Sequence, residues 1–140
     1  MTRPRQFRLI EDGQLLPEPT PRRHEEADFL HASMQYLDWA LPPDAIACHS
    51  PGEGKRSRAA QITLRRSGYK AGWPDICIIY RGRALFVELK ARRGVMSPAQ
   101  KAMMRKLIYC GADVICVRTL PDLEAALREA CVPLKGRVAA

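Results

Sequence analysis

Two acidic residues and one lysine have a spacing that could support phosphate chemistry. Asp75 and Glu88 are the only acids in residues 54–112, a stretch that contains fourteen Lys and Arg residues. A surface that approaches phosphates is expected to exclude carboxylates, because each one repels the nucleic acid backbone. Two acids retained in this stretch therefore need a local reason, and Lys90 follows Glu88 by two positions.

The two acids lie in a predicted β-hairpin. Residues 75–80 and 84–90 are rich in β-branched and aromatic residues, and Arg81-Gly82-Arg83 joins them. A two-residue turn at Arg81-Gly82 places the two acids directly opposite each other. Lys90 then lies on the same face, because strand side chains alternate. A three-residue turn would shift this register.

Facing carboxylates repel each other and destabilise a hairpin unless a cation lies between them. Carboxylate oxygens with no nearby His or thiolate favour a hard divalent ion, Mg²⁺ or Mn²⁺. The same residues also fit a second interpretation, an ion cluster of Asp75, Lys90 and Glu88 without a metal.

The composition is typical of one globular domain with a polyanionic partner. The chain has 140 residues, of which 46% are hydrophobic and 27% charged. Its net charge of +8 indicates a polyanionic binding partner, of which nucleic acid is the first candidate. Without a long apolar run or a hydrophobic N-terminal segment, we expect a cytoplasmic protein that does not enter a membrane. Five cysteines without a Cys-x-x-Cys pair favour buried, reduced thiols over disulfides or zinc.

The hydrophobic pattern predicts the elements that must position these residues. We expect a flexible basic arm over residues 1–20 and a single α/β domain over residues 21–140. In that domain, helices are predicted at 21–40, 58–67, 98–110 and 122–131, and strands at 45–48, 75–80, 84–90 and 114–117. Ser97 opens the third helix with a capping box. The buried stripe of that helix is predicted to be Met103, Met104, Leu107 and Ile108.

These residues resemble a known nuclease superfamily. Gly72-Trp73-Pro74-Asp75 followed by Glu88-Leu89-Lys90 resembles the PD-(D/E)XK pattern. The wider pattern is more specific and is similar to the VRR-NUC family over about residues 25–127. It consists of Gly54-Lys55-Arg56, Gly68 and residues 71–75, 86–90, 94–100 and 111–114. The resemblance implies a restriction-endonuclease-like core, a mixed sheet of αβββαβ order flanked by helices.

The resemblance also implies a catalytic and metal-binding set. Its members are Glu26, Asp75, Glu88, Leu89, Lys90 and Gln100. The three carboxylates and the backbone carbonyl of Leu89 would bind Mg²⁺ or Mn²⁺, with Lys90 as the catalytic lysine and Gln100 as the family's glutamine. Glu26 fits the first-helix ligand best because it lies four residues before Leu30 on the inward stripe, and Glu25 is the fallback.

Other residues are expected to meet DNA. The predicted phosphate contacts are Lys55, Arg56, Arg58, Lys70, Arg92 and Arg93. Lys55 and Arg56 fit an ordinary solvated loop equally well. Gln100 completes the capping box with or without a chemical role, and Trp73 suits either a core position or stacking on a base.

The resemblance predicts a metal-dependent endonuclease that acts as a homodimer on branched DNA such as Holliday junctions. Two alternatives stay open: the same chemistry on flap or duplex DNA in phage DNA processing, and a non-catalytic DNA-binding module. An RNA-binding protein is disfavoured, because the nine aromatic residues are not interleaved with the basic ones.

Overall fold

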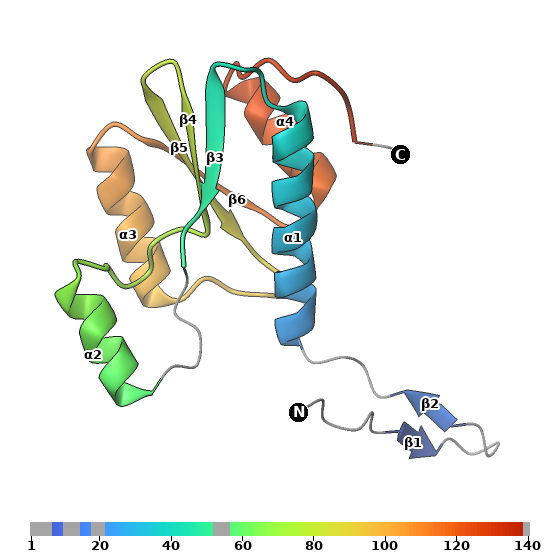
Figure 1. The fold of residues 1–140 in the computed structure, drawn as a ribbon. Helices are drawn as coiled ribbons and strands as arrows, with labels where there is room; N and C mark the ends of the chain where they lie inside the picture. The colour runs from blue at the N-terminus through green and yellow to red at the C-terminus, as the bar shows by residue number, and fades with distance from the viewer. Residues whose placement is uncertain (1–6, 10–14, 18–21, 52–56, 139–140) are drawn as a thin grey trace.

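A four-stranded mixed sheet forms the centre of the molecule (Figure 1). The computed structural model describes residues 7–9, 15–17, 22–51 and 57–138, with side chains from residue 25 onward. The strand order is β3 (Ala45–His49), β4 (Ile76–Tyr80), β5 (Arg83–Leu89) and β6 (Asp113–Val117). Strand β4 is antiparallel to both β3 and β5, and β6 is parallel to β5.

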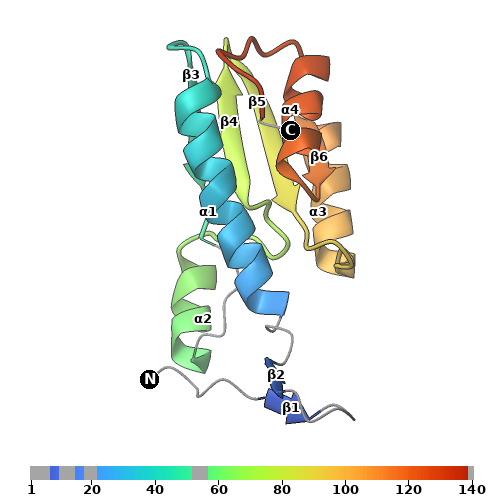
Figure 2. The ribbon, with the colours of Figure 1, turned by 90° about the vertical axis from the view of Figure 1, so that its right-hand side faces the viewer.

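Helices cover both faces of this sheet. They are α1 (Arg22–Ala40), α2 (Arg58–Arg66), α3 (Pro98–Tyr109) and α4 (Leu120–Glu129). Helices α1 and α4 lie on one face, and α3 lies on the other, with α2 beyond the end of the sheet on the same side as α3 (Figures 1 and 2). The predicted αβββαβ order is confirmed, with α2 inserted between β3 and β4.

The core lies between the sheet and the α1–α4 layer. Leu37 of α1, Ile76 and Ile78 of β4, and Leu123 and Leu127 of α4 are fully buried there. Alternate residues of β4 face this core, as period-two alternation requires. Asp75 precedes core-facing Ile76, and Glu88 lies between core-facing Val87 and Leu89, so both acids lie on the other face of the sheet.

The hairpin turn has the predicted two residues. Tyr80 pairs with Arg83, and the residues between them, Arg81 and Gly82, have φ angles of 47° and 76°. Two successive positive φ angles are typical of the tight hairpin turn whose twist matches that of the strands. The register that places Asp75 beside Glu88 follows from this turn.

The predicted buried stripe of α3 is partly wrong. Leu107 is buried and Met103 and Met104 are half-buried, but Ile108 is 57% exposed. Helix α3 packs mainly against β6, at one edge of the sheet. Periodicity identifies the apolar side of a helix, whereas the width of the buried stripe depends on how much of that side the neighbouring layer covers.

The prediction of buried cysteines is also wrong. All five cysteines are free, but Cys77 is half-buried and the other four are exposed. Four of the five lie on an edge strand or at a helix end. At such places a residue can be exposed even when its neighbours in the sequence are apolar.

A short antiparallel pair precedes α1. It consists of β1 (Phe7–Leu9) and β2 (Leu15–Pro17), which sequence analysis did not anticipate within the basic arm. The remainder of the predicted arm lies outside the described residues. In the described part of the chain, no helix combines the length and the hydropathy needed to cross a bilayer.

Candidate active site

The predicted catalytic residues meet at the end of the sheet opposite the hairpin turn. Asp75 directly precedes β4, Glu88 is the penultimate residue of β5, and Lys90 follows that strand. Glu88 and Lys90 are buried, with 2% and 8% of their surface exposed. Buried charged side chains are rare unless they are paired, so their placement marks this end of the sheet as a polar site.

Asp75 is tied to β5 through its side chain. Backbone pairing between β4 and β5 ends at Ile76 and Val87, one residue short of the two acids. There the Leu89 N–H donates to Asp75 Oδ2 at 2.8 Å. The carboxylate thus takes the place of a ladder carbonyl and lies against the Leu89 peptide.

Glu88 has two partners on one oxygen. Lys90 Nζ lies 2.9 Å from Glu88 Oε1, and Gln100 Nε2 donates to the same oxygen at 2.5 Å. The ion pair is the core of the metal-free cluster considered as an alternative. Both the Lys90 and the Gln100 contact involve Oε1 of Glu88, and neither involves Oε2.

Gln100 joins the start of α3 to the site. Its Oε1 accepts from the Ser97 N–H at 2.9 Å, and Ser97 Oγ accepts from the Gln100 N–H at 3.2 Å. This is the predicted capping box. The opposite end of the same amide donates to Glu88, so one side chain links the cap of α3 to the carboxylate.

Gly72 sets the distance between the Asp75 loop and α3. Its φ angle is +76°, and a Cβ at this position would lie 2.4 Å from the Ala99 carbonyl oxygen and 2.7 Å from Gln100 N. Only a glycine permits both the conformation and the approach. Beside it, half-buried Trp73 packs edge-on against Phe86 with ring centroids 5.2 Å apart, which matches the packing role rather than an open stacking surface.

Burial dominates the electrostatics of the two acids. It raises the pKa of Asp75, which the Leu89 hydrogen bond and the Lys90 charge partly offset. It also raises the pKa of Glu88, against the lowering effect of the Lys90 contact. Each pKa is raised further by the charge of Glu26. The local positive charge therefore does not compensate the carboxylates in full.

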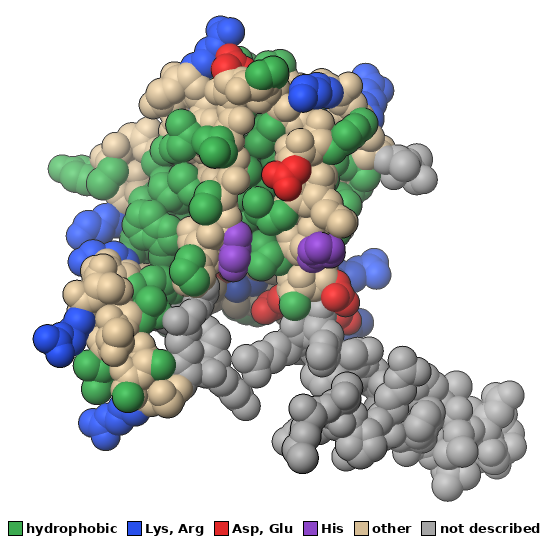
Figure 3. Space-filling model, in the orientation of Figure 1, with side chains coloured by type: hydrophobic (Ala, Val, Ile, Leu, Met, Phe, Trp, Pro, Cys, Tyr) green, Lys and Arg blue, Asp and Glu red, His purple; other side chains and the backbone are tan. Residues whose placement is uncertain are grey.

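Glu26 lies near the start of α1 and is exposed, whereas the sequence pattern placed it on the inward stripe of that helix. Its side chain is exposed, yet its charge acts on both Asp75 and Glu88. Figure 3 shows acidic and histidine side chains near the lower end of the molecule, where α1 begins. Throughout the described residues, no three His, Cys, Asp or Glu side chains are grouped closely enough to form a ready-made metal site.

The donor set nevertheless fits a hard divalent ion. Asp75 and Glu88 each have one oxygen outside the contacts described above, and the Leu89 peptide adjoins Asp75. Burial raises the pKa of both acids, and a nearby positive charge would favour their ionised forms. Glu26 is a further carboxylate whose charge acts on both acids.

The predicted DNA contacts fall into two groups. Arg58, Lys70, Arg92 and Arg93 are exposed. Lys55 and Arg56 lie outside the described residues.

His49 is a site neighbour that sequence reasoning missed. Its Nδ1 lies 2.9 Å from the Asp75 carbonyl oxygen, and its charge lowers the pKa of Asp75. The two residues are 26 positions apart, and only the pairing of β3 with β4 brings them together. No local motif around His49 signals this contact.

A mixed sheet with Asp, Glu and Lys at one end, flanked by helices, defines a restriction-endonuclease-like α/β core. The VRR-NUC domain family matches residues 18–120, and the chain belongs to this family of nucleases. A solved structure described as "VRR_NUC domain protein" superposes with a TM-score of 0.54 and 20% sequence identity, covering 80% of this chain and 88% of that chain. This likeness supports the fold. A comparison with curated proteins finds no match.

Proposed function

We propose that this nuclease is a metal-dependent endonuclease that hydrolyses phosphodiester bonds in DNA. The observation that carries the proposal is the meeting of Asp75, Glu88 and Lys90 at one end of the sheet, with Gln100 bonded to Glu88. These acids are the only two in the basic stretch of residues 54–112.

Asp75, Glu88, the Leu89 carbonyl and Glu26 would hold the metal ion. When bound, Mg²⁺ or Mn²⁺ supplies Lewis-acid chemistry, lowering the pKa of a bound water and offsetting charge on the phosphate. Lys90 is buried beside Glu88. Its ammonium group would orient the attacking water and stabilise the developing negative charge, an effect that is strengthened where water is excluded.

Gln100 acts on the geometry of the carboxylate. Its amide is fixed at one end by the Ser97 N–H and at the other by Glu88 Oε1. A carboxylate held in this way loses rotational freedom before the substrate arrives, so less entropy is lost on binding. Helix α3 thereby contributes to catalysis through its capping box.

We propose branched DNA as the preferred substrate and a homodimer as the acting form, in line with the family resemblance. Two copies would bring two sites to two strands. A dimer needs an exposed apolar surface on each copy. Strand β3 offers one, because its exposed Ile46 pairs with exposed Ile79 of β4. Figure 3 shows hydrophobic side chains gathered on this side of the molecule, with Lys and Arg around them.

The test is a cleavage assay on a four-way junction, a flap and a plain duplex, each with Mg²⁺, Mn²⁺ or EDTA. We expect cleavage of the junction in both metal lanes and none in EDTA. Asp75→Ala and Lys90→Met should abolish cleavage, and Asp75→Ala should bind DNA in EDTA at least as tightly as the wild type, because a carboxylate near phosphates is removed.

Each alternative predicts a different result. A non-catalytic DNA-binding module would bind all substrates and cleave none in any lane. Cleavage of the flap or duplex as fast as the junction would assign the same chemistry to another DNA structure. Cleavage by Asp75→Ala at the wild-type rate would show that the site is assigned to the wrong residues.

A further inference from the structure

Arg118 closes a turn that directly follows Lys90. The turn spans residues 91–94, with a hydrogen bond of 2.8 Å from the Gly94 N–H to the Ala91 carbonyl. Arg118 Nη1 donates to the carbonyl oxygens of both Ala91 and Gly94 at 2.8 Å. Arg92 and Arg93 occupy the two central positions and are exposed. One guanidinium group thus holds the turn that presents two others.

The guanidinium group of Arg118 binds backbone carbonyls, whereas three other arginines pair with a carboxylate that neutralises their charge. These three form ion pairs through their guanidinium groups: Arg81 with Asp44, Arg83 with Asp113 and Arg128 with Glu124. Arg118 has no carboxylate partner for its guanidinium within residues 25–51 and 57–138. The nearby carboxylate of Asp122 accepts from the Arg118 backbone N–H instead.

The donors of Arg118 are only partly used. Both carbonyl bonds involve Nη1, which leaves the N–H groups of Nε and Nη2 for another acceptor. Two neutral carbonyls fix the guanidinium plane but do not cancel its positive charge. An arginine anchored in this way is already oriented for an anion, and its planar group suits a phosphate.

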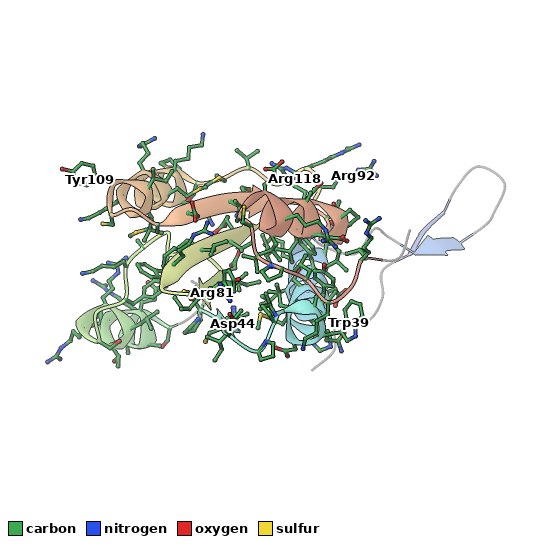
Figure 4. The ribbon with its side chains drawn as sticks, turned by 90° about the horizontal axis from the view of Figure 1, so that it is seen from above. Trp39, Asp44, Arg81, Arg92, Tyr109 and Arg118 are labelled. Atoms are coloured by element: carbon green, nitrogen blue, oxygen red, sulfur yellow. The ribbon has the colours of Figure 1, made fainter. Side chains whose placement is uncertain are left out.

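The turn adjoins the catalytic lysine. The Lys90 N–H donates to the Val117 carbonyl at 3.0 Å, so the end of β6 and the start of the turn lie together. Figure 4 shows Arg118 and Arg92 on the same side of the molecule. A phosphate bound at this turn would lie near the one that is cleaved.

We propose that Arg92, Arg93 and Arg118 form one phosphate-binding unit, the arginine turn, which binds a DNA backbone phosphate beside the scissile one. This proposal rests on the proposed function and adds a DNA contact for the same site. Arg118 lies outside the basic stretch of residues 54–112, and its two hydrogen bonds to the Ala91 and Gly94 carbonyls connect it to the turn.

The experiment measures binding of a labelled four-way junction in EDTA over a range of salt concentrations. Loss of one phosphate contact makes the negative slope of log K against log salt shallower by about 0.9. We expect this change and weaker binding for Arg118→Gln. Arg81→Gln, which removes the same charge at the opposite end of β4 and β5, should retain the wild-type slope. A wild-type slope for Arg118→Gln would overturn the proposal.

A double-mutant cycle tests whether the turn acts as a unit. Arg92→Gln and Arg118→Gln should weaken binding by less in combination than the product of their separate effects, because removal of either disrupts the same phosphate site. Additive effects would show that the two residues bind independently and would refute the arginine turn.

Two controls complete the design. If Arg118→Gln fails to fold by circular dichroism, Arg118→Lys replaces it, since it keeps the charge and loses the planar group with its Nε and Nη2 donors. It should bind more weakly than Arg81→Lys, and equal binding would refute the proposal. Cleavage by the wild type in Mg²⁺ is scored separately, so a failure of the nuclease proposal is distinguished from a failure of the arginine turn.

Discussion

Replacement of Gly72 by alanine tests whether the loop before β4 positions the active site. The φ angle of +76° carries a cost of about 1–2 kcal/mol for a residue with a Cβ. The added Cβ would also lie 2.4 Å from the Ala99 carbonyl oxygen, whereas ordinary contact begins at 3.4 Å. The loop and the first turn of α3 must therefore separate by about 1 Å.

That separation acts on both halves of the site. Asp75 follows Gly72 by three residues, and Gln100 follows Ala99 in the first turn of α3. A misplacement of about 1 Å can reduce an enzyme's rate by about 100-fold. We expect a loss of this size in the cleavage rate of Gly72→Ala, measured on folded protein at saturating metal.

Gly82 provides a matched control. It has the same φ angle of +76°, but a Cβ there would meet nothing within 4 Å. Gly82→Ala should lose about 1–2 kcal/mol of unfolding free energy from the backbone conformation alone and keep its cleavage rate. Gly72→Ala should lose more in urea unfolding. Equal losses of stability and rate in the two variants would refute the positioning role of Gly72.

Three further predictions concern the acids and their partners. Burial raises the pKa of Asp75, so the folded state binds more protons between the unfolded and folded pKa values, and stability falls as pH rises through that window. Asp75→Asn should remove this fall and unfold at a higher temperature than the wild type at neutral pH, with the gain disappearing below the unfolded pKa; a gain independent of pH would contradict the assignment. Gln100→Glu keeps the acceptor of the capping box but loses the donor to Glu88, so it should retain thermal stability far better than cleavage; equal loss of both would reduce Gln100 to a helix cap. Glu26→Gln should raise the metal concentration needed for half-maximal cleavage while Glu25→Gln does not, and the reverse result would exchange their roles.

Local chemistry in the sequence predicted the helix cap and the hairpin, but the hairpin's register depended on whether its turn has two residues or three. The two-residue turn at Arg81-Gly82 sets the register, because the length of a hairpin turn fixes which residues pair along both strands. The capping box at Ser97 depends on residues three positions apart and needs no tertiary partner. The turn and the cap each depend on interactions between residues a few positions apart, so both could be predicted from the sequence.

The assembly of the site required the fold. Glu88 and Gln100, Asp75 and His49, and Ala91 and Arg118 are 12, 26 and 27 positions apart. These pairs meet because β3, β6 and α3 pack around the β4–β5 hairpin. The exposure of Ile108 has the same origin, since periodicity marks an apolar face but not the neighbour that covers it. The sequence by itself determined the reactive groups and their local register; the tertiary structure decided which groups share a hydrogen bond, because such bonds require contact within about 3 Å across separate elements.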